Sequence, residues 1–252
     1  MGAEPYYLIA LLAFAPGIFW LGYIYKKDKW EPEPQKLVLC VFFLGMLAVI
    51  PAMLASFVLS LGIPHREISS AYRTCFIAPV IEELCKFLVV YLTIFRSWEF
   101  DEPMDGIVYA AAAALGFASL ENVSYLWFEY QTPEFVPPPD SSVIPQSALW
   151  NLAFLRGILS VPGHVIDSCM WGYALGVAKF LRHRALARII IVKGLILGMA
   201  LHALFNSLAS YGLSVAGLLI LQVSLLYYLN KKVKIALHKS PYANPIKKPI
   251  FK

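Results

Sequence analysis

The chain has 252 residues, of which 59% are hydrophobic and 15% charged, with a formal net charge of +5 at pH 7. Apolar segments of spanning length recur along nearly its whole length, which excludes an ordinary soluble domain and predicts a polytopic α-helical membrane protein. The positive charge lies in a few short clusters and gives no nucleic-acid signature. All four cysteines lie within apolar segments, so neither disulfides nor a Cys-rich metal motif is expected.

We predict an all-α bundle with about seven membrane spans, located in the cell membrane. The first apolar run lacks a basic n-region and a cleavage site, so it is expected to remain as a helix. The expected spans are Tyr6–Tyr25, Leu37–Leu61, Tyr72–Phe95, Met104–Phe128, Leu149–Phe180, Ile189–Ala209 and Leu213–Leu229. Residues 1–230 are then one transmembrane domain, and residues 231–252 form a basic tail.

The Lys and Arg residues between the expected spans predict the orientation. Basic clusters follow the first span, separate the fifth from the sixth, and fill the tail. The Pro-rich loop Glu129–Gln146 carries no Lys or Arg. The N-terminus is therefore expected outside and the C-terminus in the cytoplasm.

The third expected span contains ionisable side chains inside an apolar run. Glu82 and Glu83 are adjacent, and Lys86 follows within one helical turn, so it can reach either carboxylate. Pro79 precedes them and frees a backbone carbonyl. One interpretation is a buried ion pair that fixes the helix register. The other is a functional site, because charges at membrane depth normally face a bundle interior or a wet cavity.

The next three expected spans also carry polar side chains: Glu121 and Asn122 in the fourth, His164 and Asp167 in the fifth, and His202 and Asn206 in the sixth. Counting at about 1.5 Å per residue brings the glutamates and histidines to one level in the outer half of the bilayer. Pro162 precedes His164 as Pro79 precedes the glutamate pair, and two broken helices at one level make room for water.

Two histidines with up to three glutamates form a suitable zinc set, with one position left for water and a further glutamate as the base. Each residue also has a structural interpretation. A single helix-interior histidine more often bonds a neighbour than a metal, Asn206 can join two helices, and Asp167 can orient His164. A proton-coupled transporter or channel can use the same carboxylates and histidines, although no polar line continues to the cytoplasmic face.

Six motifs in order carry a family resemblance: Glu31-Pro32-Glu33-Pro34, Glu82-Glu83-Leu84-Cys85-Lys86, Asp105-Gly106-Ile107-Val108-Tyr109, Gly116 to Asn122, Arg156 with Gly163-His164, and His202 to Asn206. This set resembles the PrsW family of intramembrane proteases, a relative of the CAAX prenyl-protease and Abi membrane proteins. The resemblance implies hydrolysis of a peptide bond in a membrane-anchored protein, which in some bacteria is an anti-sigma factor.

On this basis residues 1–230 are expected to form the protease domain. The expected catalytic residues are Glu82, Glu83, Lys86, Asn122 and Asn206, and the expected metal ligands are Glu121, His164 and His202, with zinc as the cofactor. A metal-free glutamate mechanism of the CAAX type stays open, as does a non-catalytic scaffold that holds a membrane-anchored partner. Cleavage is expected near the outer membrane boundary, where a substrate helix end opens at least cost and the loop Glu129–Gln146 can act as a lid.

Overall fold

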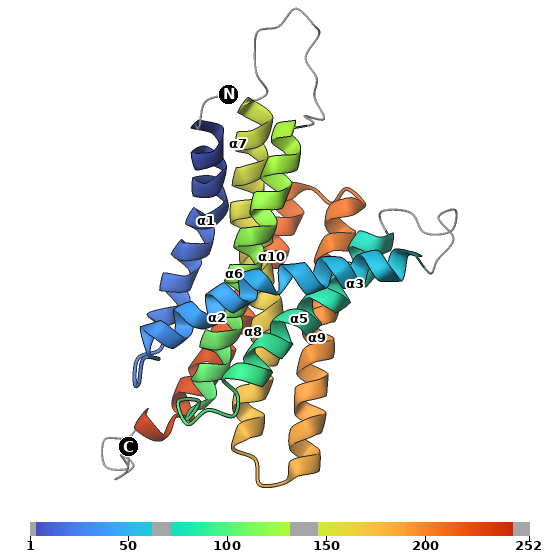
Figure 1. Cartoon of the computed structure of the whole chain (residues 1–252). Helices are drawn as coiled ribbons and strands as arrows, with labels where there is room; N and C mark the ends of the chain where they lie inside the picture. Colours follow the sequence, from blue (N-terminus) through green and yellow to red (C-terminus); the bar gives the residue numbers. More distant parts are fainter. Residues whose placement is uncertain (1–3, 62–71, 132–145, 244–252) are drawn as a thin grey trace, which may run out of the picture.

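The computed structural model describes residues 4–61, 72–131 and 146–243. Within these ranges every regular element is a helix, as expected (Figure 1). The elements are α1 Glu4–Tyr25, α2 Gln35–Leu47, α3 Val49–Leu61, η1 Arg73–Ile77, α5 Ala78–Thr93, α6 Pro103–Gln131, α7 Gln146–Leu155, η2 Arg156–Ser160, α8 Val161–Lys179, α9 Arg184–Ser210, α10 Val215–His238 and η3 Pro241–Ala243.

Helix α6 is the central element of the bundle. Its first half is buried on every side, and Ala110 to Ala114 are fully inaccessible. A helix that is apolar all round is stable only when neighbours cover it completely. Helix α8 packs along α6, α1 and α2 cover other sides of it, and α9 packs against α8 (Figure 1). Helix α5 contacts α6, α8 and α9, so it can present side chains to all three.

Small residues allow α6 and α8 to approach closely. A Cβ added at Gly172 of α8 would lie 2.3 Å from the carbonyl oxygen of Gly106 in α6. A Cβ added at Gly176 would lie 2.2 Å from the carbonyl oxygen of Pro103. Backbone contact through small residues is how helices associate where lipid removes the hydrophobic driving force. This packing fixes the position of α8 and therefore of His164.

Two helices of the bundle are widened just before the polar side chains of Glu82 and His164. The π-helical segments η1 and η2 each span five residues, and Pro79 and Pro162 follow them in the first turn of α5 and α8. Side chains from other helices satisfy backbone carbonyls of these segments. Asn206 donates to the Thr74 carbonyl at 3.0 Å, and Gln222 donates to the Leu159 carbonyl at 3.0 Å. Single π turns of this kind occur often at functional sites.

Five helical stretches are long and apolar enough to cross a membrane: Tyr6–Tyr25, Gln35–Leu59, Pro103–Gln131, Ala148–Lys179 and Arg184–Ser210. They correspond to five of the seven expected spans. The remaining two lie on η1 with α5 and on α10. The first carries the Glu82, Glu83 and Lys86 charges, and the second ends in lysines, which lowers the hydropathy of both. The total number of spans and the orientation stay predictions.

The boundary expected at residue 231 falls inside α10, which continues to His238. The reason is an apolar stripe in its last turns, since Val233, Ala236 and Leu237 are buried against the bundle.

The expected lid falls mainly on residues 132–145, outside the described residues. At its edges, Glu129 to Gln131 extend α6 and Gln146 begins α7.

Candidate active site

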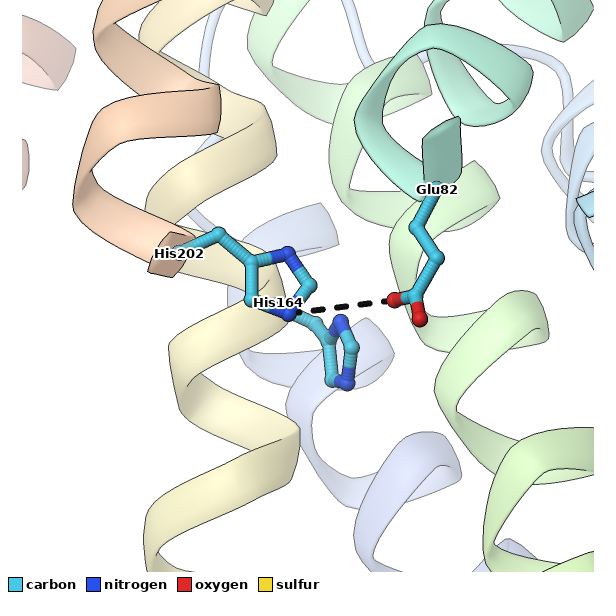
Figure 2. A group of neighbouring side chains, drawn as sticks. All are labelled: Glu82, His164 and His202. Atoms are coloured by element: carbon cyan, nitrogen blue, oxygen red, sulfur yellow. Dashed lines mark ion pairs between the residues drawn. The ribbon is translucent and has the colours of Figure 1, made fainter. Parts of the chain in front are cut away.

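The side chains predicted at one level do come together. Figure 2 shows Glu82 of α5, His164 of α8 and His202 of α9 pointing toward one another. One ligand atom from each of them lies within 4.8 Å of the others. The two imidazole rings meet edge to face, with their centroids 4.9 Å apart. The three residues come from three different helices, so only the folded bundle creates this group.

Glu82 is the carboxylate that faces the two histidines with an uncommitted oxygen. Its Oε2 lies 3.7 Å from His202 Nε2, and no residue within the described ranges donates a hydrogen bond to it. The Glu82 side chain is 13% exposed, whereas that of Glu83 is inaccessible. A buried carboxylate oxygen without a donor is rare and points to a missing proton, water or ion.

Glu83 has a different environment, although it is the next residue. Its Oε1 accepts from Lys86 and faces His202 Nδ1 at 3.1 Å. Its Oε2 accepts from Ser168 at 2.7 Å and from the Trp171 indole at 2.8 Å. Four partners therefore occupy both oxygens. The buried ion pair considered from the sequence exists, and Glu83 is its acidic member.

The ring nitrogens of the two histidines have distinct partners. Because Glu83 faces His202 Nδ1, the Nε2 atom of His202 is left toward Glu82. In His164, Nδ1 lies 3.1 Å from the Lys86 ammonium and Nε2 lies 3.2 Å from Glu121 Oε2. Within the described chain, Asp167 is not a partner of either His164 nitrogen.

Glu121 belongs to a second layer of the site, which contains Arg156 of η2. The Arg156 guanidinium donates to Glu121 Oε2 at 2.5 Å and to Asn122 Oδ1 at 2.5 Å. It also lies over the Tyr125 ring, with its carbon 3.9 Å from the centroid. A guanidinium that is held at three points fixes the position of the carboxylate next to His164.

The two asparagines expected in the catalytic set occupy the rim. Asn122 donates to the Ala13 carbonyl of α1 at 3.4 Å, in addition to accepting from Arg156. Asn206 donates to the Thr74 carbonyl of η1. Both amides therefore join neighbouring helices, the structural role considered for Asn206.

Ser168 and Trp171 are two partners of Glu83 that were not expected from the sequence. They follow His164 by four and seven residues and so share its helix face. That spacing is the signal that would have identified them. In an apolar sequence, however, serine and tryptophan are also ordinary residues of a helix interface.

The donor set fits a zinc-like metal. Two imidazoles and a carboxylate are the ligands of many catalytic zinc sites, which leave a fourth position for water. The Glu83 contact to His202 Nδ1 is the outer hydrogen bond that such ligands normally have. Glu121 contacts His164 as well, but its Oε2 is already paired with Arg156. The geometry therefore favours Glu82 over Glu121 as the third ligand.

The chain is similar to known proteins over most of its length. The family model described as "PrsW family intramembrane metalloprotease" matches residues 33–229. The chain is 37% identical over 167 residues to Protease PrsW of Geobacillus kaustophilus, a match that covers 66% of this chain and 64% of the relative. It is 32% identical over 180 residues to Protease PrsW of Bacillus subtilis, covering 71% and 72% of the two chains.

A third relative, Protease PrsW of Oceanobacillus iheyensis, is 33% identical over 195 residues, which cover 76% of this chain and 78% of the relative. No solved structure matches the chain. The family match includes every residue of the site described above, from Glu82 to His202. The chain therefore belongs to the PrsW family of intramembrane metalloproteases.

Proposed function

We propose that this protein is a multi-pass enzyme of the cell membrane that hydrolyses a peptide bond in a membrane-anchored protein substrate. The observation that carries the proposal is the convergence of Glu82, His164 and His202, with Glu121 beside them, inside an otherwise apolar bundle. Family membership supports the reaction class. The family resemblance also suggests a membrane-anchored anti-sigma factor as a substrate.

Glu82, His164 and His202 are proposed to hold a divalent metal, with zinc as the best match to their nitrogen and oxygen atoms. Such a metal polarises the scissile carbonyl and lowers the pKa of water. This assignment differs from the expectation that Glu121 is a ligand and that Glu82 or Glu83 is the base. Glu121 is better placed as the base. Arg156 and His164 both contact its Oε2 atom, which leaves Oε1 for a water molecule.

The remaining residues would then orient these groups. Glu121 takes a proton from water and returns it to the leaving amine, as general acid–base hydrolysis of a peptide requires. Glu83 fixes the His202 ring through Nδ1, and Lys86 balances the Glu83 charge. Arg156 positions Glu121. Asn122 and Asn206 stabilise the arrangement of the helices around the site.

One contact favours the metal-free alternative of the CAAX type. When the Lys86 ammonium donates to His164 Nδ1, the ring proton lies on Nε2 and points at Glu121. A metal bound at Nε2 requires Lys86 to turn away from Nδ1.

Elemental analysis of the purified protein beside His164→Ala and His202→Ala separates the two mechanisms. Stoichiometric zinc in the wild type that is lost in both variants supports the metal site, whereas full activity of a metal-free preparation in strong chelator supports the alternative.

The reaction and its position are tested in proteoliposomes with a panel of single-span substrates that includes a membrane-anchored anti-sigma factor. We expect cleavage near the outer end of the substrate span, with activity lowered about 100-fold or more by Glu82→Gln and by Glu121→Gln. Mass spectrometry of the new termini locates the cut. Termini at the cytoplasmic end would refute the proposed orientation, and full cleavage by both variants would refute the site.

A further inference from the structure

A second group of buried acidic side chains lies beside the start of α6, whereas Glu121 of the proposed active site lies in the second half of that helix. Asp28 follows α1, Glu102 immediately precedes α6, and Asp105 lies in the first turn of α6. Asp28 is 3% exposed, and Glu102 and Asp105 are inaccessible. One carboxylate oxygen from each of the three lies within 4.8 Å of the others.

Part of this group has an ordinary structural role. Asp105 Oδ2 accepts from the backbone N–H groups of Asp101 at 2.6 Å and Glu102 at 2.8 Å. This is the reach-back contact that an acidic residue in the first turn makes to the N-cap. Glu102 Oε2 accepts from the Ser240 hydroxyl, which joins the segment after α10 to the start of α6. These contacts use one oxygen of Asp105 and one of Glu102.

The other oxygens have no such partner. Within residues 4–61, 72–131 and 146–243, no donor reaches Asp105 Oδ1, Glu102 Oε1 or either oxygen of Asp28. Asp28 is thus an almost fully buried carboxylate whose two oxygens are both unsatisfied and which faces the other two acids. Nothing in the capping contacts accounts for its burial, and a buried polar group without a partner is costly.

No Lys or Arg of the described chain forms an ion pair with these three carboxylates. Lys179 donates instead to the carbonyls of Phe95 at 2.9 Å and Ser97 at 2.7 Å. Burial, followed by the Glu102 charge, raises the pKa of Asp28 to about 9. Neutralisation of the group therefore requires either protons shared among the acids or a bound cation.

We propose that Asp28, Glu102 and Asp105 bind one hard divalent cation, Ca²⁺ or Mg²⁺. The ligand set consists of carboxylate oxygens alone, which these ions prefer and which differs from the histidine-containing set at the active site. The cation joins three separate parts of the chain: the connector after α1, the start of α6 and, through Ser240, the segment after α10. It is a structural clamp, and its existence does not depend on the proposed proteolysis.

The test uses the full-length protein in detergent, treated with chelator and exchanged into metal-free buffer. Its melting temperature is then measured with and without CaCl₂ or MgCl₂, using Asp28→Asn as the cluster variant and Glu129→Gln as the matched control. At a cation concentration about 100 times Kd, we expect the melting temperature of wild type and control to rise by about 5 °C or more. Asp28→Asn should not respond, and in chelator it should be at least as stable as wild type, because an amide of nearly the same shape replaces a buried carboxyl group that has no hydrogen-bond donor.

The active site is excluded as the source of the effect by His164→Ala with His202→Ala, which should keep the full response. If Asp28→Asn does not fold, Tb³⁺ luminescence sensitised by tyrosine and displaced by Ca²⁺ tests the wild type and the histidine variant directly. Either of two results would overturn the proposal. One is a response in Asp28→Asn equal to that of wild type, and the other is no response of wild type to either cation.

Discussion

Glu82 and Glu83 show how one step along a helix separates two roles. Adjacent helical residues point about 100° apart, so Glu83 turns into the core of the bundle while Glu82 turns toward the histidines. Lys86, Ser168, Trp171 and His202 satisfy Glu83, whereas Glu82 keeps an oxygen without a donor. The chemistry proposed for Glu82 needs that open oxygen.

Glu82→Gln and Glu83→Gln are therefore expected to differ in stability. Glu83→Gln leaves the buried Lys86 charge without its partner and should lower the free energy of unfolding by about 3–5 kcal/mol. Glu82→Gln should change it by less than about 1 kcal/mol while abolishing most cleavage. Thermal unfolding in detergent, read beside a cleavage assay, measures both quantities. A larger loss of stability in Glu82→Gln than in Glu83→Gln would contradict the assignment.

Arg156 offers a test of positioning within the second layer. Arg156→Lys keeps the positive charge but cannot contact Glu121 and Asn122 together over the Tyr125 ring. We expect kcat to fall about 10- to 100-fold with little change in KM, because Glu121 loses its fixed orientation. Arg184→Lys, at the exposed start of α9, is the matched control and should behave as wild type. Equal kinetics in the two variants would show that Arg156 does not position the base.

The sequence predicts most of the residues in the candidate site but not the separate role proposed for each of them. Ionisable groups inside apolar spans are rare, so Glu82, Glu83, Glu121, His164 and His202 stand out. The hydrogen bonds from Ser168 and Trp171 to Glu83 depend on which faces of α5 and α8 pack together. The sequence alone does not show which helix faces are in contact. For the same reason, the sequence does not show that Asp28 lies beside Glu102 and Asp105.

At the scale of elements, two helices share one construction: a five-residue π segment, a proline in the next turn, and then the site residues. The prolines were visible in the sequence. The π turns were not, because they depend on side chains from other helices that satisfy the widened backbone. Asn206 and Gln222 supply those donors. The extension of α10 beyond residue 230 likewise depends on packing, because Val233, Ala236 and Leu237 are buried in the main apolar cluster.

The close packing of α6 and α8 can be tested with a single methyl group. Gly172→Ala places a Cβ 2.3 Å from the Gly106 carbonyl oxygen, so the helices must move apart. We expect a loss of about 1–3 kcal/mol, offset only in part by the better helix propensity of alanine. Gly22→Ala is the control, because a Cβ there meets nothing within 4 Å, and it should be neutral or slightly stabilising. Unfolding of both variants in the same detergent measures the difference, and equal stability would contradict the packing argument.

At the scale of the whole molecule, the described residues include two groups of potential metal ligands that differ in composition. One combines the imidazoles of His164 and His202 with the Glu82 carboxylate, and the other consists of the carboxylates of Asp28, Glu102 and Asp105. The all-helical class and five spanning segments follow from length and hydropathy alone. The two further stretches that were expected to span, η1 with α5 and α10, are less apolar because they carry Glu82, Glu83 and Lys86 and the lysines near the end of α10.

We propose that Glu82, Glu121, His164 and His202 form a centre that adds water to a peptide bond. The most direct test of this proposal is cleavage of a single-span substrate by reconstituted protein in water enriched in heavy oxygen. We predict that mass spectrometry will find one heavy oxygen atom in the new carboxyl terminus of the wild-type product, and no such product with Glu82→Gln or His202→Ala. Labelled product at the wild-type rate from both variants would contradict the account.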